Sequence, residues 1–420
     1  MPPRPHVVVV GSGFGGLNAA LGLARLPVNV TVVDRNNYHG FWPLLYQVAT
    51  AGLGADDIAH PIRALYAPHP NIDVRLGVVT AIDLDRRVVE VAGEPPLHYD
   101  FLVLAAGSSN DDFGLPGVQE HAFGLKTLPD AVRLRNHVLT MFEQADAEGG
   151  RDTAALTVVM VGGGPTGVEL AGALAELISR NLANDFRHLD LTAARVVLVE
   201  AADHLLPGFS PASQEAARRT LETRGVDVRF HARLTKVTPD GVELEDGTAI
   251  PARTVVWTAG VRANPLAGLL EVEKGKGGTV LVEPDLSLSG HPEVFAIGDV
   301  AAAASRGGGH LPQLAQVAIQ GGRHAAHQIG RVLAGKKTKP FRYHDHGIMA
   351  TIGRRSAVAE LPGGVHLQGT PGWLAWLGVH LVFLIGFRNR VVVLVNWAWN
   401  YLTWDRASRV ILMEDAGPET

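Results

Sequence analysis

Two glycine-rich segments, each directly after a short apolar run, constrain this chain more than any other feature of its sequence. Gly11–Gly16 follows Val7–Val10, and Gly162–Gly167 follows Val158–Val161. Each pattern predicts a buried strand, a tight turn and the start of a helix, where backbone N–H groups can bind a pyrophosphate. One such segment alone is weak evidence. Two of them, about 150 residues apart, predict that the chain holds two dinucleotides.

The glycines within each segment have different expected tasks. The first makes the turn, the second lets the backbone approach a phosphate, and the third lets the helix pack on the strand. Phe14 is expected only to pack the first loop. The candidate binding residues of the two segments are Gly11, Gly13, Phe14, Gly15 and Gly16, and then Gly162, Gly164, Pro165, Thr166 and Gly167.

A second strand follows each glycine segment at nearly the same distance. Phe101–Gly107 and Val255–Gly260 both end in an Ala-Gly turn, which adds Ala106, Gly107 and Gly260 to the candidates. The matched spacing predicts two copies of one dinucleotide-binding unit, the second inserted into the first. Two unrelated α/β domains with similar turns are the alternative.

The predicted organisation is α/β: two Rossmann-like domains and an amphipathic helical C-terminal region. Residues 1–125 and 280–345 form the first domain, 150–275 the second, and 365–420 the C-terminal region. The strand Val294–Asp299 belongs to the first domain and ends on a carboxylate. A helix is expected to begin at Pro312, because proline is tolerated in a first helical turn.

Composition narrows the chemistry. The chain has 420 residues, 46% of them hydrophobic, which is enough for two or three domains with cores of their own. A net charge of −5 argues against a nucleic-acid partner. The absence of cysteine excludes redox-active disulfides, iron–sulfur clusters and cysteine zinc sites. His344 and His346 lack further ligands at a suitable spacing, so we expect solvated histidines and no metal site.

Two carboxylates stand where the ribose of a dinucleotide is usually bound. Asp34 ends the strand Val30–Val33, and Glu200 ends Val196–Val199. A carboxylate accepts hydrogen bonds from a 2′-hydroxyl and repels a 2′-phosphate, so Glu200 favours NADH over NADPH. For Asp34 a turn or helix cap is the alternative.

The tail is apolar and rich in tryptophan. Trp373–Phe387 and Val391–Trp404 are each shorter than a bilayer crossing, and Arg388, Arg390, Arg406 and Arg409 flank them. Tryptophan with flanking arginine favours the headgroup zone of a membrane. We therefore expect a monotopic membrane anchor, with a buried hairpin or a dimer contact as the alternatives.

Three further segments carry a specific resemblance. Leu44–Gly52, Ala315–Gln320 and Ile385–Arg390 closely resemble type II NADH dehydrogenases, the single-subunit NADH:quinone oxidoreductases of the two-dinucleotide-binding flavoproteins. The resemblance implies non-covalent FAD on the first glycine loop, with its ribose on Asp34 and its ribityl chain on Asp299. It also implies hydride transfer from NADH to FAD, then two electrons to a membrane quinone without proton pumping.

The resemblance also suggests residues near the reacting rings. Glu169, expected in the first turn of its helix, would lie near nicotinamide and flavin; a favourable charge at the helix end is the alternative. Ala315 and Gln316 would lie at the flavin, and Gln316 and Gln320, one turn apart, would bind a quinone carbonyl. Two solvated glutamines are the alternative there. His380 is a further quinone candidate, or else a core histidine.

The expected partners are NADH, a membrane quinone (menaquinone or ubiquinone) and the cytoplasmic side of the cell membrane, for a homodimeric enzyme of the respiratory chain. Two other functions stay open. One is a soluble NADH-dependent reductase of a protein electron carrier, which has no use for the tail. The other is a non-enzymatic NADH-sensing flavoprotein, which would not turn over with quinones.

Overall fold

The computed structural model describes residues 4–403, 406 and 408–411, which form two compact units. The first unit includes residues up to 40, 59–109 and 261–346; the second includes 41–58, 110–260 and the chain from 347 onward. These limits differ from the expected domains. The segment 41–58 and the tail both pack with the second unit. Of the expected C-terminal region, residues 404, 405, 407 and 412–420, Trp404 among them, lie outside the described residues.

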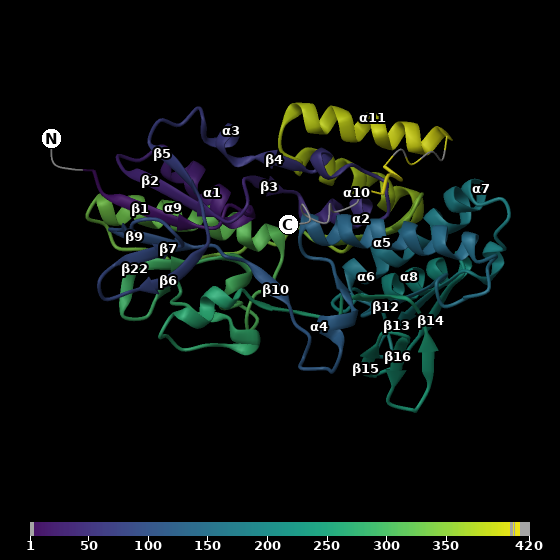
Figure 1. Cartoon of the computed structure of the whole chain (residues 1–420). Coiled ribbons are helices and arrows are strands. Elements are labelled where there is room, and N and C mark those ends of the chain that lie inside the picture. Colours follow the sequence, from purple (N-terminus) through teal and green to yellow (C-terminus); the bar gives the residue numbers. More distant parts are fainter. Residues whose placement is uncertain (1–3, 404–405, 407, 412–420) are drawn as a thin grey trace, which may run out of the picture. The chain divides into compact units, whose positions relative to one another are not determined.

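A six-stranded sheet forms the centre of the first unit (Figure 1). Strand β1 (His6–Val10) pairs in parallel with β2 (Asn29–Asp34) and β9 (Phe101–Leu104). The outer strands are β5 (Ile72–Leu76), β22 (His291–Ala296) and β21 (Ser287–Leu288). Both faces of the sheet are covered, and the valines of β1 are accordingly all buried.

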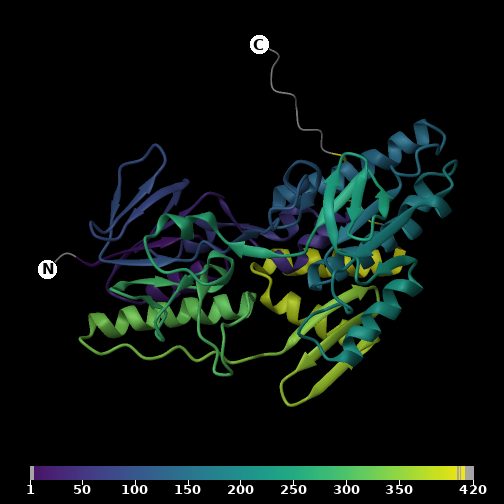
Figure 2. The same cartoon turned by 90° about the horizontal axis from the view of Figure 1, so that it is seen from below.

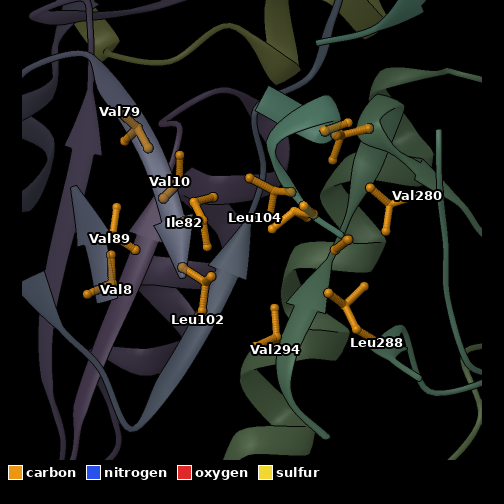
Figure 3. Packing of buried hydrophobic residues seen from close by; sticks show 14 of the residues in the cluster. Val8, Val10, Val79, Ile82, Val89, Leu102, Leu104, Val280, Leu288 and Val294 are labelled. Atoms are coloured by element: carbon orange, nitrogen blue, oxygen red, sulfur yellow. The ribbon is translucent and has the colours of Figure 1, made fainter. Parts of the chain in front are cut away.

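Helices cover one face of this sheet and a meander covers the other. Helices α1 (Phe14–Leu23) and α9 (Ala315–Leu333) approach each other closely at Gly322. A Cβ atom on Gly322 would lie only 2.1 Å from the Gly15 carbonyl oxygen, so only glycine fits there. On the other face, Val8 and Val10 belong to a core with Ile82 and Val89 (Figure 3). That meander consists of β6 (Val79–Asp83), β7 (Val88–Val91) and β8 (Leu97–His98).

The second unit repeats this plan. Strand β12 (Thr157–Val161) lies between β13 (Arg195–Val199) and β18 (Thr254–Trp257), with all pairs parallel. The outer strands are β11 (Phe123–Gly124) and β14 (Val226–Arg229), and the meander is β15 (Leu234–Thr238), β16 (Gly241–Leu244) and β17 (Ala249–Pro251). The predicted fold of two Rossmann-like domains is therefore confirmed.

Helices and a small antiparallel sheet complete the second unit. Its helices include α2 (Leu45–Ala49), α5 (Leu128–Ala147), α6 (Pro165–Glu176), α8 (Pro211–Thr223), α10 (Gly369–Phe383) and α11 (Phe387–Thr403). The sheet of β24 (Ile348–Gly353), β25 (Ser356–Leu361) and β26 (Val365–Gln368) packs against α10 (Figure 2). Within the described residues, none of the helices has both the length and the apolar character that crossing a bilayer requires.

Candidate functional site

The glycine loop of the first unit has the geometry that a pyrophosphate needs. Gly11 has φ 96°, and a Cβ atom on Gly16 would lie 1.8 Å from the Gly11 carbonyl oxygen, so neither position accepts a side chain. Around Gly13, at the N-terminal end of α1, no other described atom lies within 4 Å of the place of a Cβ. The loop therefore leaves space for a phosphate beside the helix N-terminus.

The second loop has the same construction. Gly162 has φ 106°, a Cβ atom on Gly167 would lie 2.0 Å from the Gly162 carbonyl oxygen, and the space at Gly164 is open among the described residues. Gly260 is close to an aromatic side chain, because a Cβ atom there would lie 2.5 Å from the ring of Phe113. Packing under that ring by itself requires glycine there, and a cofactor contact of Gly260 stays a prediction.

The two carboxylates bind their loops in equivalent ways. Asp34 Oδ2 accepts a hydrogen bond from the Ser12 N–H at 2.6 Å, and Glu200 Oε2 accepts one from the Gly163 N–H at 2.6 Å. The other oxygen of each accepts from an N–H two residues further along, at 2.7 and 2.8 Å. Burial raises the pKa of Asp34, and its backbone hydrogen bonds oppose this. Each carboxylate oxygen has lone pairs left for ribose hydroxyls.

Behind the first loop lies a polar cluster that the sequence did not indicate. Ser12 Oγ and Tyr66 Oη are hydrogen-bonded at 2.9 Å, and His39 Nδ1 lies 2.7 Å from the Ser12 carbonyl oxygen. Burial lowers the pKa of His39, so the ring is neutral and its Nδ1–H donates. Tyr66 and His39 therefore hold the first glycine loop through Ser12. In the sequence, the only signal for this cluster is the polar residue Ser12 at the second position of the glycine loop.

Asp299 lies at the carboxyl end of the same sheet. It follows β22, next to the end of β9, and its Oδ2 accepts a hydrogen bond from Ser108 Oγ at 2.5 Å. The turns at Gly107 and Gly298 have φ 72° and 70°. Ligands of open parallel sheets bind at this edge, and a carboxylate suits hydroxyl groups.

Helix α9 begins at Ala315, not at the expected Pro312. The preceding residues stay extended because the Leu311 N–H binds the Ala303 carbonyl oxygen and the Gln313 side chain binds the Asp299 carbonyl oxygen. The correction leaves Gln316 and Gln320 one turn apart on the helix, as predicted.

Both glutamine side chains hold an extended backbone segment. Gln320 Nε2 donates to the His344 carbonyl oxygen at 2.8 Å, and its Oε1 accepts from the His344 N–H at 2.9 Å. Gln316 Oε1 accepts from the His346 N–H at 3.1 Å. The two histidine side chains are exposed. Among the described residues, no group of three or more candidate side chains could hold a metal ion.

Glu169 lies in the second turn of α6, not in the first, so a helix-end charge effect does not account for it. Its Oε1 accepts a hydrogen bond from the Thr351 N–H of β24 at 3.2 Å. Burial raises the pKa of Glu169 to about 8, against the effects of this N–H and of the Trp376 indole. Glu169 therefore carries a proton at neutral pH.

Trp376 places His380 in the same part of the second unit. The two rings stack with centroids 4.0 Å apart, and His380 Nδ1 lies 2.7 Å from the Trp376 carbonyl oxygen. Phe41 contacts His380 edge-on. Burial lowers the pKa of His380 to about 4, so its imidazole is neutral at physiological pH.

An aromatic pocket of about 120 Å³ has Trp376 among its lining residues. It opens between α2, α6, α10 and α11. Its aromatic walls are Tyr46, Trp373, Trp376, Trp397 and Tyr401. Such a lining suits a planar, weakly polar ring.

Comparisons with known proteins agree with this geometry. A family model for pyridine nucleotide-disulphide oxidoreductases matches residues 5–322, and one for the NDH2 C-terminal domain matches 346–404. The chain is 41% identical to the type II NADH:quinone oxidoreductase Ndh of Mycobacterium tuberculosis, covering 100% of this chain and 93% of that protein. It is 30% identical to the demethylphylloquinone reductase NdbB of Synechocystis sp., covering 94% and 96%.

The chain belongs to the type II NADH:quinone oxidoreductase family. A solved structure of NDH2 from Plasmodium falciparum in complex with NADH has the same fold, with a TM-score of 0.89 and 17% identity over 98% of this chain and 100% of that one. The predicted family, the activity of an FAD-dependent NADH:quinone oxidoreductase, and the cofactors FAD and NADH are confirmed.

The C-terminal region characteristic of this family turns the polar face of α11 inward. Asn389 Nδ2 donates to the carbonyl oxygens of Asp56 and Asp57 at 3.3 and 3.0 Å, and Asn400 Nδ2 donates to that of Gly52 at 3.0 Å. Between them, Trp397 Nε1 donates to Gln47 Oε1 at 2.8 Å. Helix α11 is thus attached to the segment 41–58 through polar side chains.

The opposite face of α11, together with part of α10, is apolar and exposed; we call these residues the apolar face. Phe387 is 82% exposed, Leu402 78% and Val382 66%. Its other members are Leu374, Val379, Phe383, Val391, Leu394, Val395 and Trp399. In Figure 1, α11 lies over α10 and α2. Exposed apolar surface of this extent marks an interaction site.

Three of the four tail arginines bind groups of the protein itself. Only 12% of the Arg406 side chain is exposed: it donates to the carbonyl oxygen of Thr50 at 2.8 Å and pairs with Glu176 at 3.4 Å. Arg409 pairs with Asp185 at 2.9 Å. Arg390 is exposed, but its guanidinium binds carbonyl oxygens at the end of α10. Arg406, one of the arginines that flank the apolar stretches in the sequence, is therefore turned toward the protein.

Proposed function

We propose that the first unit binds FAD and the second binds NADH, each through its own glycine loop. The repeated loop supports this assignment: in both units the place of the second glycine is open, and the acidic residue binds the loop through an N–H. FAD, when bound, supplies the ring that accepts a hydride and passes on two electrons. Asp34 and Asp299 would orient FAD, and Glu200 would bind the adenosine ribose of NADH.

Glu169, His380, Gln316 and Gln320 are proposed to act at the reacting rings. Glu169 holds a proton at neutral pH and can hydrogen-bond the nicotinamide carboxamide or deliver that proton to a quinone oxygen. Neutral His380 can hydrogen-bond a quinone carbonyl through Nε2 without the cost of burying a charge. For Gln320, a quinone contact competes with its two hydrogen bonds to the His344 backbone, so holding residues 344–346 is part of its proposed task.

We further propose that the apolar face docks on the cytoplasmic side of the cell membrane. Phe387, Leu402 and Val382 would enter the headgroup boundary, while the asparagine face of α11 stays on the protein. A lipid-soluble quinone would then reach the aromatic pocket without crossing water. The same helices could pair two copies of the chain, so we also propose a homodimer, which analytical ultracentrifugation in detergent would test.

The decisive experiment is NADH oxidation by the purified protein with menaquinone and ubiquinone analogues, with and without lipid vesicles. Turnover with a quinone that rises on adding lipid supports the proposal. Turnover with a protein electron carrier and no response to lipid would instead support the soluble reductase. Flavin reduction by NADH without turnover by any quinone would support the NADH-sensing flavoprotein.

A further inference from the structure

A second pocket of the second unit, about 740 Å³ in volume, is lined by five arginines; we call it the arginine pocket. Arg180, Arg219, Arg224, Arg354 and Arg355 line it with Thr220, Thr223 and Tyr401. No carboxylate is among these described lining residues. A concave site with five guanidinium groups is unusual in a chain whose net charge is −5. Its size is that of a small-molecule site, roughly 300–1,000 Å³.

Part of this positive charge is already balanced. Arg219 pairs with Glu215 at 2.5 Å, and Arg224 pairs with Glu176. Each of these carboxylates is shared with another arginine: Glu215 with Arg218, and Glu176 with Arg406. Arg218 also pairs with Glu222. Three carboxylates therefore serve these four arginines, and the five guanidinium groups that line the pocket still outnumber them.

Two further guanidinium groups of the arginine pocket, those of Arg354 and Arg355, lie over one aromatic ring. Arg354 Cζ lies 4.0 Å and Arg355 Cζ 5.1 Å from the centroid of the Tyr401 ring, and Arg355 Nε donates to Tyr401 Oη. Arg355 has φ 58° in the turn between β24 and β25. Cation–π contacts hold both groups without neutralising their charge.

The position of Tyr401 relates this pocket to the apolar face. Tyr401 lies in the last turn of α11, between Trp399, which is 56% exposed, and Leu402, which is 78% exposed. A helix that docks by its apolar side places its flanking aromatic and basic groups at the phosphate level of the membrane. The pocket would then lie beside that phosphate layer.

We propose that the arginine pocket binds the phosphate headgroup of an anionic phospholipid. The planar forks of several arginines match the paired oxygens of a phosphodiester, and the acyl chains would continue along the apolar face. This inference depends on the proposed membrane docking. It adds that one defined site, and not diffuse charge, gives the protein its preference for an anionic surface.

The test compares vesicle binding by the FAD-loaded wild type and two triple variants. R180Q/R219Q/R355Q neutralises the exposed arginines of the pocket. R133Q/R151Q/R233Q removes the same charge from exposed positions of the same unit outside it. Binding is measured to phosphatidylcholine vesicles and to vesicles with 30% phosphatidylglycerol. Each arginine near an anionic surface strengthens binding roughly fivefold.

We expect the wild type to bind anionic vesicles more tightly than neutral ones. The affinity for anionic vesicles should fall roughly a hundredfold in the pocket variant and less than tenfold in the control. Equal losses in both variants, or no preference in the wild type, would overturn the proposal. Binding of the wild type to neither vesicle would overturn the membrane docking itself. NADH oxidation with a short-chain quinone and flavin content should be unchanged in both variants.

A second measurement separates lipid from free anion. Thermal unfolding of the holoenzyme is followed with dihexanoyl phosphatidylglycerol below its micelle concentration and with inorganic phosphate at equal concentration. Stabilisation by the lipid alone, absent in R180Q/R219Q/R355Q, supports the lipid site. Equal stabilisation by inorganic phosphate would show a general anion site and overturn the assignment to a phospholipid.

Discussion

Glu200 Oε2 accepts a hydrogen bond from the Gly163 N–H at 2.6 Å, so the residue that ends β13 is tied to the loop that follows β12. The same bond, at the same length, joins Asp34 to Ser12 in the first unit. In both units the carboxylate therefore does two tasks: it shapes the glycine loop, and it presents its remaining lone pairs to a ribose.

We expect Glu200→Gln to narrow the preference for NADH over NADPH by about tenfold or more, because it removes a negative charge that faces the 2′-phosphate. The amide oxygen can still accept from Gly163. The measurement is kcat/KM for both nucleotides. Glu200→Asp, which keeps the charge, is the control and should retain discrimination. Equal use of NADH and NADPH by the wild type would contradict the role of Glu200.

Glu169 should make stability depend on pH. Its pKa is raised to about 8, so the folded state keeps a proton that the unfolded chain releases above its ordinary pKa of 4.5. Its contribution to stability therefore falls as pH rises from about 4.5 to about 8. The Tm difference between Glu169→Gln and the wild type should depend on pH. At pH 9 this difference should favour the variant by a few degrees more than at pH 5.

The control for Glu169 is the exposed Glu143, whose change to Gln should leave the two Tm curves parallel. The same pair of variants can be followed in the quinone half-reaction. If Glu169 delivers a proton, the wild-type rate decreases as pH passes 8, and Glu169→Gln removes this decrease. Parallel Tm curves for Glu169→Gln would show that its carboxyl titrates normally.

The apolar face should be separable from the fold. Changing Phe383, Phe387 and Leu402 to Ser should weaken binding to neutral vesicles by at least about a hundredfold, since each buried side chain of this size contributes about 1.5–3 kcal/mol. Flavin should stay bound. Serine at Leu76, Val78 and Leu269, which are exposed in the first unit, should not reduce vesicle binding. Unchanged flotation of the first variant would remove the docking proposal.

Gln320→Ala should slow reoxidation of the reduced protein by quinone about two- to twelvefold, the effect of one neutral hydrogen bond of roughly 0.5–1.5 kcal/mol. Flavin reduction by NADH should stay nearly intact. Gln320→Glu is a useful companion, because it can still accept from the His344 N–H but cannot donate. Stopped-flow measurement follows flavin reduction by NADH and flavin reoxidation by quinone separately. An unchanged rate of reoxidation by quinone in both variants would place the quinone elsewhere.

Arg406→Met should destabilise the holoenzyme by about 3 kcal/mol, because Glu176 loses one of its partners inside the protein. Burial lowers the pKa of Arg406, yet its hydrogen bonds to backbone carbonyl oxygens and to Glu176 hold the charge in place. The measurement is thermal unfolding. Arg409→Met, which breaks a pair with the exposed Asp185, is the control and should cost less than about 1 kcal/mol.

The sequence predicted what depends on local patterning. Two glycine loops, the strands before them and the acidic residues after β2 and β13 are all short-range signals, and the structure has them where they were expected. The spacing of Gln316 and Gln320 survived even though α9 begins three residues later than predicted, because a one-turn interval does not depend on where the helix starts.

Features that depend on contacts between distant parts of the chain could not be predicted from the sequence. The assignment of residues 41–58 to the second unit, the burial of Arg406 beside Glu176, and the stacking of His380 on Trp376 all follow from tertiary contacts. The raised pKa of Glu169 needs β24 and α10 folded against α6. A composition of arginine and tryptophan in the tail could not say which arginine lies inside the protein.

The asparagine face of α11 has a consequence for the order in which the chain acquires its structure during synthesis. Trp397 and Gln47 are 350 residues apart in the sequence, and Asn400 and Gly52 are 348 apart. Gln47 Oε1 and the Gly52 carbonyl oxygen therefore gain these hydrogen-bond partners only when nearly the whole chain has left the ribosome. A transcript that stops shortly before α11 would yield a chain with both loops folded and this early segment still open to chaperones and proteases.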